Sequence, residues 1–102
     1  MTEHLETKRE QIVQACARHR VTRLDVFGSA VRPDFRPDES DVDLLVEFAP
    51  MEGMERVDAY FALLDELRNI LGDRIDLVML GAVKNPFIAS EISRTRQQLY
   101  AA

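Results

Sequence analysis

The sequence has little that could cross-link the chain or carry it into a membrane. Cys16 is its single cysteine, which excludes a disulfide within the chain and is typical of a reducing compartment. No apolar run approaches the roughly 18 residues of a membrane span. The first residues also lack the basic and apolar regions of a secretory signal peptide. We therefore expect a cytoplasmic protein that makes no use of a membrane.

Positive charge is scarce as well. The 102 residues include 13 Lys and Arg against 18 Asp and Glu, which gives a formal net charge of −5. Proteins that hold DNA or RNA by its backbone need a basic surface, so the composition disfavours a direct nucleic-acid substrate. The length suits one domain, and a hydrophobic content of 46% supplies its core. We expect a single domain over residues 1–102.

The spacing of apolar residues predicts alternating helices and strands. Alternation with a period of two predicts strands over residues 21–27, 42–48 and 74–80. Helical spacing predicts helices over residues 3–19, 53–71 and from Pro86 through Leu99. With a short helical turn after the first strand, the order is α-β-α-β-α-β-α. This order predicts a fold of the α/β (α+β) class.

The second predicted strand presents carboxylates on one side. Asp41, Asp43 and Glu47 alternate with Val42, Leu44, Val46 and Phe48. Neighbours two apart on a strand lie roughly 7 Å apart, so Asp41 and Asp43 could share one cation. Like charges about 4–5 Å apart repel by roughly 3–4 kcal/mol at an effective dielectric near 20, and a cation relieves that repulsion. The alternative is that Asp41 and Asp43 are two solvated surface carboxylates. We interpret Glu47, which lies farther along the strand, as a surface residue.

The first predicted strand ends at Gly28-Ser29, where the residues suit phosphate. Glycine lets the backbone approach a ligand closely, and a short turn that opens a helix points N–H groups outward. Ser29 adds a hydroxyl, and Arg32 adds a planar cationic fork. A phosphate-binding turn and a cation site on adjacent strands together predict a site for a nucleoside triphosphate.

Two motifs resemble the signature of the minimal nucleotidyltransferases of the polymerase-beta superfamily. They are Gly28-Ser29-x-x-Arg32 and Ser40-Asp41-x-Asp43-Leu44. The resemblance runs along most of the chain, including the third strand, which carries Asp76. It implies the nucleotidyltransferase fold, a small mixed β-sheet with helices packed against it. The chain departs from the family at Pro33, where glycine is usual, and in a slightly longer loop to Ser40.

The resemblance also implies the chemistry of the site. Nucleotidyl transfer uses two divalent ions about 3.5–4 Å apart, and carboxylates with substrate phosphates favour Mg²⁺. The family likeness assigns the metal-binding and catalytic roles to Asp41, Asp43 and Asp76, and it lets Asp76 help deprotonate the acceptor hydroxyl. A lone aspartate on a strand is usually structural or solvated, so the role of Asp76 rests largely on the family likeness. The likeness assigns nucleotide binding, with ATP as substrate, to Gly28, Ser29 and Arg32.

In a single domain of this size we expect no part to be left over to bind a complex acceptor. Minimal nucleotidyltransferases of this size are typically encoded with a small helical HEPN ribonuclease toxin, and the antitoxin transfers AMP from ATP to a tyrosine of that toxin. The resemblance thus implies an Mg²⁺-dependent protein adenylyltransferase that acts as an antitoxin and forms a hetero-oligomer with its toxin. Two alternatives stay open. Pro33 and the acidic surface suit a non-catalytic antitoxin that occludes the toxin, and the chain could also modify a small molecule as an oligomer.

Overall fold

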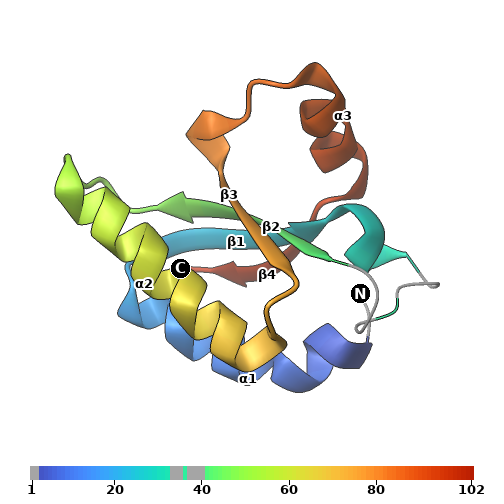
Figure 1. Cartoon of the computed structure of the whole chain (residues 1–102), viewed down its shortest axis with the longest axis horizontal. Coiled ribbons are helices and arrows are strands. Elements are labelled where there is room, and N and C mark those ends of the chain that lie inside the picture. The colour runs from blue at the N-terminus through green and yellow to red at the C-terminus, as the bar shows by residue number, and fades with distance from the viewer. Residues whose placement is uncertain (1–2, 33–35, 37–40) are drawn as a thin grey trace.

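The computed structural model describes residues 3–32, 36 and 41–102, so Pro33 and Ser40 lie outside the described residues (Figure 1). In chain order the elements are α1 (Glu3–Arg18), β1 (Val21–Phe27), the 3₁₀ turn η1 (Gly28–Val31), β2 (Val42–Phe48), α2 (Met54–Leu71), β3 (Ile75–Met79), the 3₁₀ turn η2 (Leu80–Ala82), α3 (Pro86–Thr95) and β4 (Gln97–Ala101). Within the described ranges, no helix is long and apolar enough to cross a membrane.

The four strands form one mixed sheet in the order β3-β2-β1-β4. β2 and β3 run parallel, whereas β1 runs antiparallel to both β2 and β4. Figure 1 shows α1 and α2 together on one face of the sheet and α3 on the opposite side. The expected small mixed sheet with helices packed against it is therefore confirmed.

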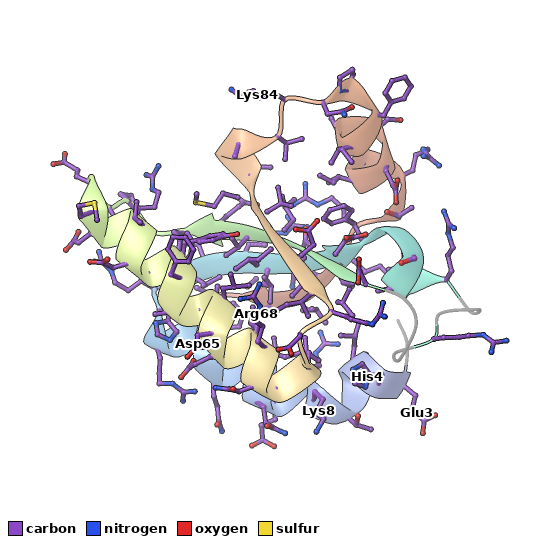
Figure 2. All side chains as sticks on the ribbon, in the orientation of Figure 1. Glu3, His4, Lys8, Asp65, Arg68 and Lys84 are labelled. Carbon is purple, nitrogen blue, oxygen red and sulfur yellow. The ribbon has the colours of Figure 1, made fainter. Side chains whose placement is uncertain are left out.

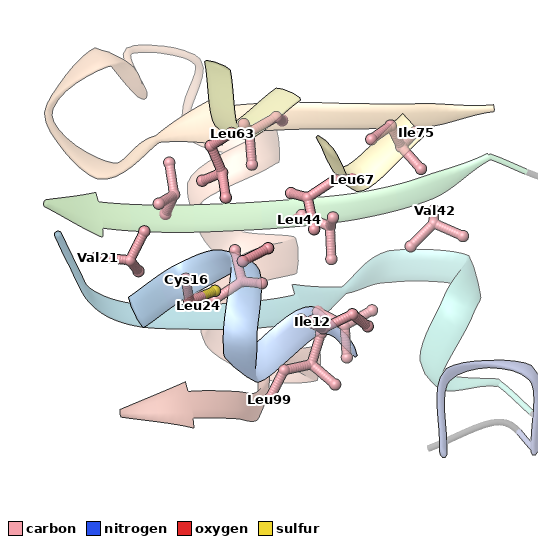
Figure 3. Packing of buried hydrophobic residues seen from close by; sticks show 14 of the residues in the cluster. Ile12, Cys16, Val21, Leu24, Val42, Leu44, Leu63, Leu67, Ile75 and Leu99 are labelled. Carbon is pink, nitrogen blue, oxygen red and sulfur yellow. The ribbon is translucent and has the colours of Figure 1, made fainter. Parts of the chain in front are cut away.

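The main core lies between the sheet and the pair α1–α2 (Figure 3). Of the apolar residues that alternate along β2, Val42, Leu44 and Val46 are buried there and Phe48 packs against them partly buried, as the period-two pattern predicts. Cys16 of α1 is fully buried in the same core, and burial raises the pKa of its thiol to about 12. The thiol is therefore protonated at neutral pH and packs as a small apolar side chain. The cluster includes Ile12, Leu24, Leu44, Leu63 and Leu67.

The opposite face of the sheet is partly covered by α3. Phe27, Leu45 and Ile92 form a second, smaller apolar cluster there. Leu45 leaves only 1% of its surface exposed, although it stands on the face of β2 that also carries Asp43. This face therefore combines a short apolar patch under α3 with carboxylates around it.

The prediction of a helix through Leu99 is wrong at its end. The helix stops at Thr95, Arg96 leaves the helical conformation with a ψ of 133°, and the chain continues as β4 beside β1. Two interactions favour the strand: Leu99 is buried in the main core, and β4 pairs with the backbone of β1, which would otherwise form an open sheet edge. The other predicted helices and strands match the structure to within one residue at each end.

Candidate active site

Asp43 and Asp76 lie side by side on the face of the sheet that α3 partly covers. They are register partners on the parallel strands β2 and β3, so their side chains point to the same side. Burial raises the pKa of Asp43 from 3.8 to about 6, and the negative charges of Asp76, Glu91 and Asp41 add to the shift. The structure therefore gathers negative charge around Asp43.

Asp41 immediately precedes Val42, the first residue of β2. Its side chain is 66% exposed, and its Oδ1 lies 3.8 Å from Nη1 of Arg74. No three His, Cys, Asp or Glu side chains within residues 3–32, 36 and 41–102 are close enough together to hold a metal ion. Asp41 would have to swing inward to join Asp43 and Asp76, and its exposure leaves it free to do so.

The Gly28-Ser29 turn packs directly against the carboxylates. Gly28 has a φ of +69°, a conformation that side chains other than glycine's rarely adopt. A Cβ placed on Gly28 would lie 2.7 Å from Oε1 of Glu91 and 2.8 Å from Oδ2 of Asp43. The carboxylates of Glu91 and Asp43 therefore converge on the space beside Gly28, and only glycine leaves that space open.

Hydrogen bonds tie this turn to its neighbours. The backbone N–H of Gly28 donates to Oγ1 of Thr95 over 2.8 Å, and that hydroxyl donates to the carbonyl of Glu91 over 2.6 Å. The Ser29 hydroxyl donates to the carbonyl of Asp41 over 3.2 Å, which links the turn to the start of β2. Arg32, an exposed residue, donates its backbone N–H to the Ser29 carbonyl. The predicted nucleotide-binding residues thus lie in one turn beside Asp41 and Asp43.

Glu91 and Thr95 belong to the site, although sequence reasoning missed both. They lie one turn apart on α3, and each looks like an ordinary polar position of an amphipathic helix. No motif marks them, because their proximity to Gly28 depends on how α3 packs over the sheet. A sequence of one chain offers no signal for that packing.

A pocket of about 390 Å³ opens beside the two carboxylates. Its floor is formed by Phe27, Asp43 and Asp76, which stand in register across three strands. Its side wall comes from the connection between η2 and α3, on which Figure 2 labels Lys84. The pocket is therefore acidic at its floor and bounded by a segment that stands away from the sheet.

A buried ion cluster lies farther along the same face. Asp25 of β1 is fully buried, and it pairs with Arg23 at 3.0 Å and with Arg96 at 2.5 Å. Arg96 also lies 3.5 Å from Glu47. Glu47, which we expected to be a surface residue, is 32% exposed and joins this cluster. The cluster fastens the junction between α3 and β4 to the centre of the sheet.

Gly28→Ala should lower the stability of the protein by about 2 kcal/mol or more. The new methyl group would meet two carboxylates within 2.8 Å, and the positive φ adds strain. Gly81→Ala is the matched control, because its Cβ would meet nothing within 4 Å and its φ lies outside the strained range. Urea unfolding of both variants tests this. Equal stability of the two variants would contradict the tight approach of Asp43 and Glu91 to Gly28.

The raised pKa of Asp43 gives a signed pH prediction. The folded state holds the Asp43 proton more tightly than the unfolded chain, so between about pH 4 and pH 6 a rise in pH weakens the fold. Asp43→Asn removes this effect, and it should be more stable than the parent by about 1–2 kcal/mol at pH 7, allowing for solvent screening. The gain should vanish near pH 3.5. Thermal unfolding of both metal-free proteins at the two pH values measures it, and a gain independent of pH would exclude this cause.

The structure brings two carboxylates side by side on a mixed sheet, beside a Gly-Ser turn, an arrangement suited to the transfer of phosphate-linked groups. Comparison with known proteins gives the family. The profile of the nucleotidyltransferase domain matches residues 9–99. The chain belongs to this family, and it is a nucleotidyltransferase. The expectation drawn from the two motifs is confirmed at this level.

Individual relatives agree with this assignment. The chain is 37% identical over 75 residues to a protein of Methanocaldococcus jannaschii that is provisionally named a protein adenylyltransferase, a match that covers 74% of this chain and 72% of the relative. A solved structure provisionally described as a minimal nucleotidyltransferase is 32% identical, with a TM-score of 0.67 and coverage of 93% of this chain and 92% of that one.

A third match concerns the fold alone. It is the solved complex of a tri-AMPylated HEPN toxin with its MNT antitoxin from Shewanella oneidensis. The match has a TM-score of 0.63 at 19% identity, and it covers 95% of this chain and 72% of that one. The TM-score shows that the two chains share the arrangement of helices and strands, and the low identity limits the likeness to that arrangement.

Proposed function

We propose that this nucleotidyltransferase is a protein adenylyltransferase that transfers AMP from ATP to a tyrosine of a HEPN-type toxin and so neutralises it. The observation that carries the proposal is the placement of Asp43 beside Asp76, next to the Gly28-Ser29 turn. The adenylyltransferase name of a 37% identical relative supports the reaction. The similar fold in a complex with an AMPylated toxin supports the partner.

The donor set fits Mg²⁺. Burial raises the pKa of Asp43, and the neighbouring carboxylates add to the shift by repelling its charge; a cation placed among them would remove that repulsion. Asp43 and Asp76 would hold the ions, joined by Asp41 once its side chain turns away from Arg74. Bound magnesium would stabilise charge on the attacking and leaving oxygens.

The chain's own residues would divide the remaining work. Ser29 and Arg32 would bind the β- and γ-phosphates, and the Gly28 turn would let them approach the backbone closely. The tyrosine oxygen would form a bond to the α-phosphorus while the bond from that phosphorus to the bridging oxygen breaks. Pyrophosphate leaves, and Asp76 accepts the phenolic proton. The products are an adenylylated tyrosine and pyrophosphate.

The biological role follows from the acceptor. The protein would act in the cytoplasm as an antitoxin, in a hetero-oligomer with its toxin, without binding nucleic acid directly. Its formal net charge of −5 agrees with a protein partner rather than a nucleic acid. The whole 102-residue chain would serve as one catalytic domain.

The test is transfer of label from α-labelled ATP. The protein is incubated with labelled ATP, Mg²⁺ and the product of the neighbouring gene, and the modified residue is located by mass spectrometry. We expect AMP on a tyrosine of the partner, and no transfer when EDTA removes the metal. Transfer to a soluble metabolite without the partner would instead show the small-molecule enzyme.

One observation keeps the occlusion hypothesis as a second candidate. Asp41 pairs with Arg74, and in the described part of the chain it does not join Asp43 and Asp76 in a cluster that could hold a metal ion. A growth assay separates the two roles. If the double variant Asp41→Asn/Asp43→Asn still rescues cells from the toxin, then binding alone neutralises it. Loss of rescue supports catalysis, provided that the variant protein still binds the toxin in a pull-down.

A further inference from the structure

The pocket beside Asp76 has a composition that limits what can occupy it. At its floor stand carboxylates, whose oxygens accept hydrogen bonds, while Phe27 and Val78 give that floor an apolar part. Val83 and Ile88 add apolar surface from the wall and from α3. A suitable ligand is therefore apolar over most of its surface and carries a hydrogen-bond donor at the end that reaches the floor.

The direction of the reaction decides which part of the reactants enters the pocket. Gly28, Asp43 and Asp76 follow one another across the ends of β1, β2 and β3. A triphosphate held at the Gly28 turn places the leaving pyrophosphate on the β1 side. Since attacking and leaving oxygens lie roughly in line, the attacking oxygen arrives from the β3 side. Val78 of β3 lies on that side, and Val83 follows β3 in the chain after η2.

We propose that this pocket holds the aromatic ring of the acceptor tyrosine, and not the adenine of ATP. The proposal rests on the adenylyltransferase function proposed above. A phenol places its ring against the apolar walls and donates its O–H to the carboxylates at the floor. Adenine has one donor group, its amino group, beside three ring-nitrogen acceptors, so fewer of its edges suit those carboxylates. A volume of about 390 Å³ leaves room for such a ring.

The rim agrees with a polypeptide acceptor. Leu80 and Phe87 stand at the two ends of the connection that forms the wall, and they are 44% and 83% exposed. Exposed apolar side chains beside a pocket favour contact with a protein segment. The residues that flank the tyrosine would pack on them while the ring enters.

Two variants of the wall test the assignment. Ala82→Trp fills the pocket with an indole, and Val83→Asp adds a carboxylate to its apolar wall. Ala89→Trp is the matched control, because Ala89 is also exposed but does not line the pocket. Val83→Asp keeps the test decisive if the indole of Ala82→Trp turns toward solvent.

Each variant is measured in two ways. The first is AMP transfer from ATP with Mg²⁺ to N-acetyltyrosinamide, and the second is affinity for the Mg²⁺ complex of a non-hydrolysable ATP analogue by calorimetry. We expect the transfer efficiency of both wall variants to fall at least about tenfold, the effect of a clash in an acceptor pocket. Their nucleotide affinity should stay within about twofold, and Ala89→Trp should match the parent in both.

The outcomes separate this proposal from the function it rests on. Loss of nucleotide affinity in the wall variants, or unchanged transfer in both, would overturn the acceptor pocket while leaving the adenylyltransferase intact. If the parent transfers AMP to no tyrosine, the proposed function fails. The pocket is then judged by methyl NMR: shifts of Val83 and Ile88 on adding N-acetyltyrosinamide support it, and their absence overturns it.

Discussion

Asp43→Asn should reduce AMP transfer by at least 10²–10³-fold, a loss of about 3–4 kcal/mol in transition-state stabilisation. Asp43 stands between the Gly28 turn and Asp76, so its carboxylate touches both the proposed phosphate site and the proposed metal site. The amide of asparagine keeps the shape but removes the charge that attracts the cation. The measurement is the rate of transfer from labelled ATP to the partner protein at saturating Mg²⁺.

Two controls make this loss interpretable. Asp58→Asn makes the same chemical change at an exposed position of α2, and it should transfer at the parent rate. Mg²⁺ with the ATP analogue should raise the melting temperature of the parent through mass action, but should raise that of Asp43→Asn less. A variant that transfers normally, or whose metal-free form is clearly less stable than the parent, would mean that Asp43 has a structural partner instead.

The sequence predicted the strands of this site well because their signal is local. The alternation along β2 identifies both the buried face and the carboxylates opposite, and the structure gives β1 and β2 the predicted bounds. The proximity of Asp76 to Asp43 came from the family likeness alone. A single aspartate in a strand carries no information about which strand lies beside it, and here the parallel pairing of β2 and β3 decides it.

The parts that sequence reasoning missed depend on contacts distant in the chain. Glu91 and Thr95 reach the Gly28 turn only because α3 crosses over the sheet. The sequence of β4 resembled the end of a helix, because five residues with one buried leucine fit the helical period and the strand period equally well. Its pairing with β1 and the ion pair at Arg96 select the strand. Local propensity is overridden by tertiary contacts at this position.

Arg96→Ala should lower the stability of the protein by about 3 kcal/mol, the largest stability change we expect from one surface-accessible residue. Asp25 is fully buried, and removal of Arg96 leaves it paired with Arg23, whose side chain is 40% exposed. A buried charge left short of partners typically costs about 3–5 kcal/mol. For a chain of this size we expect the melting temperature to fall by about 10–20 °C.

Arg94→Ala is the matched control, because Arg94 is an exposed residue of the same helix and its loss should change stability by less than about 0.5 kcal/mol. A double-mutant cycle isolates the pair: Asp25→Ala combined with Arg96→Ala should cost clearly less than the two single losses together, since no charge is then left buried. Additive losses, or equal stability of the Arg96 and Arg94 variants, would mean that Arg96 is not what compensates Asp25.

The distinction matters for the site, because Arg96 directly follows Thr95, whose hydroxyl accepts the hydrogen bond from Gly28. If the cluster fixes this end of α3, Arg96→Ala should also weaken ATP-analogue binding at temperatures where the variant is still folded, whereas Arg94→Ala should not.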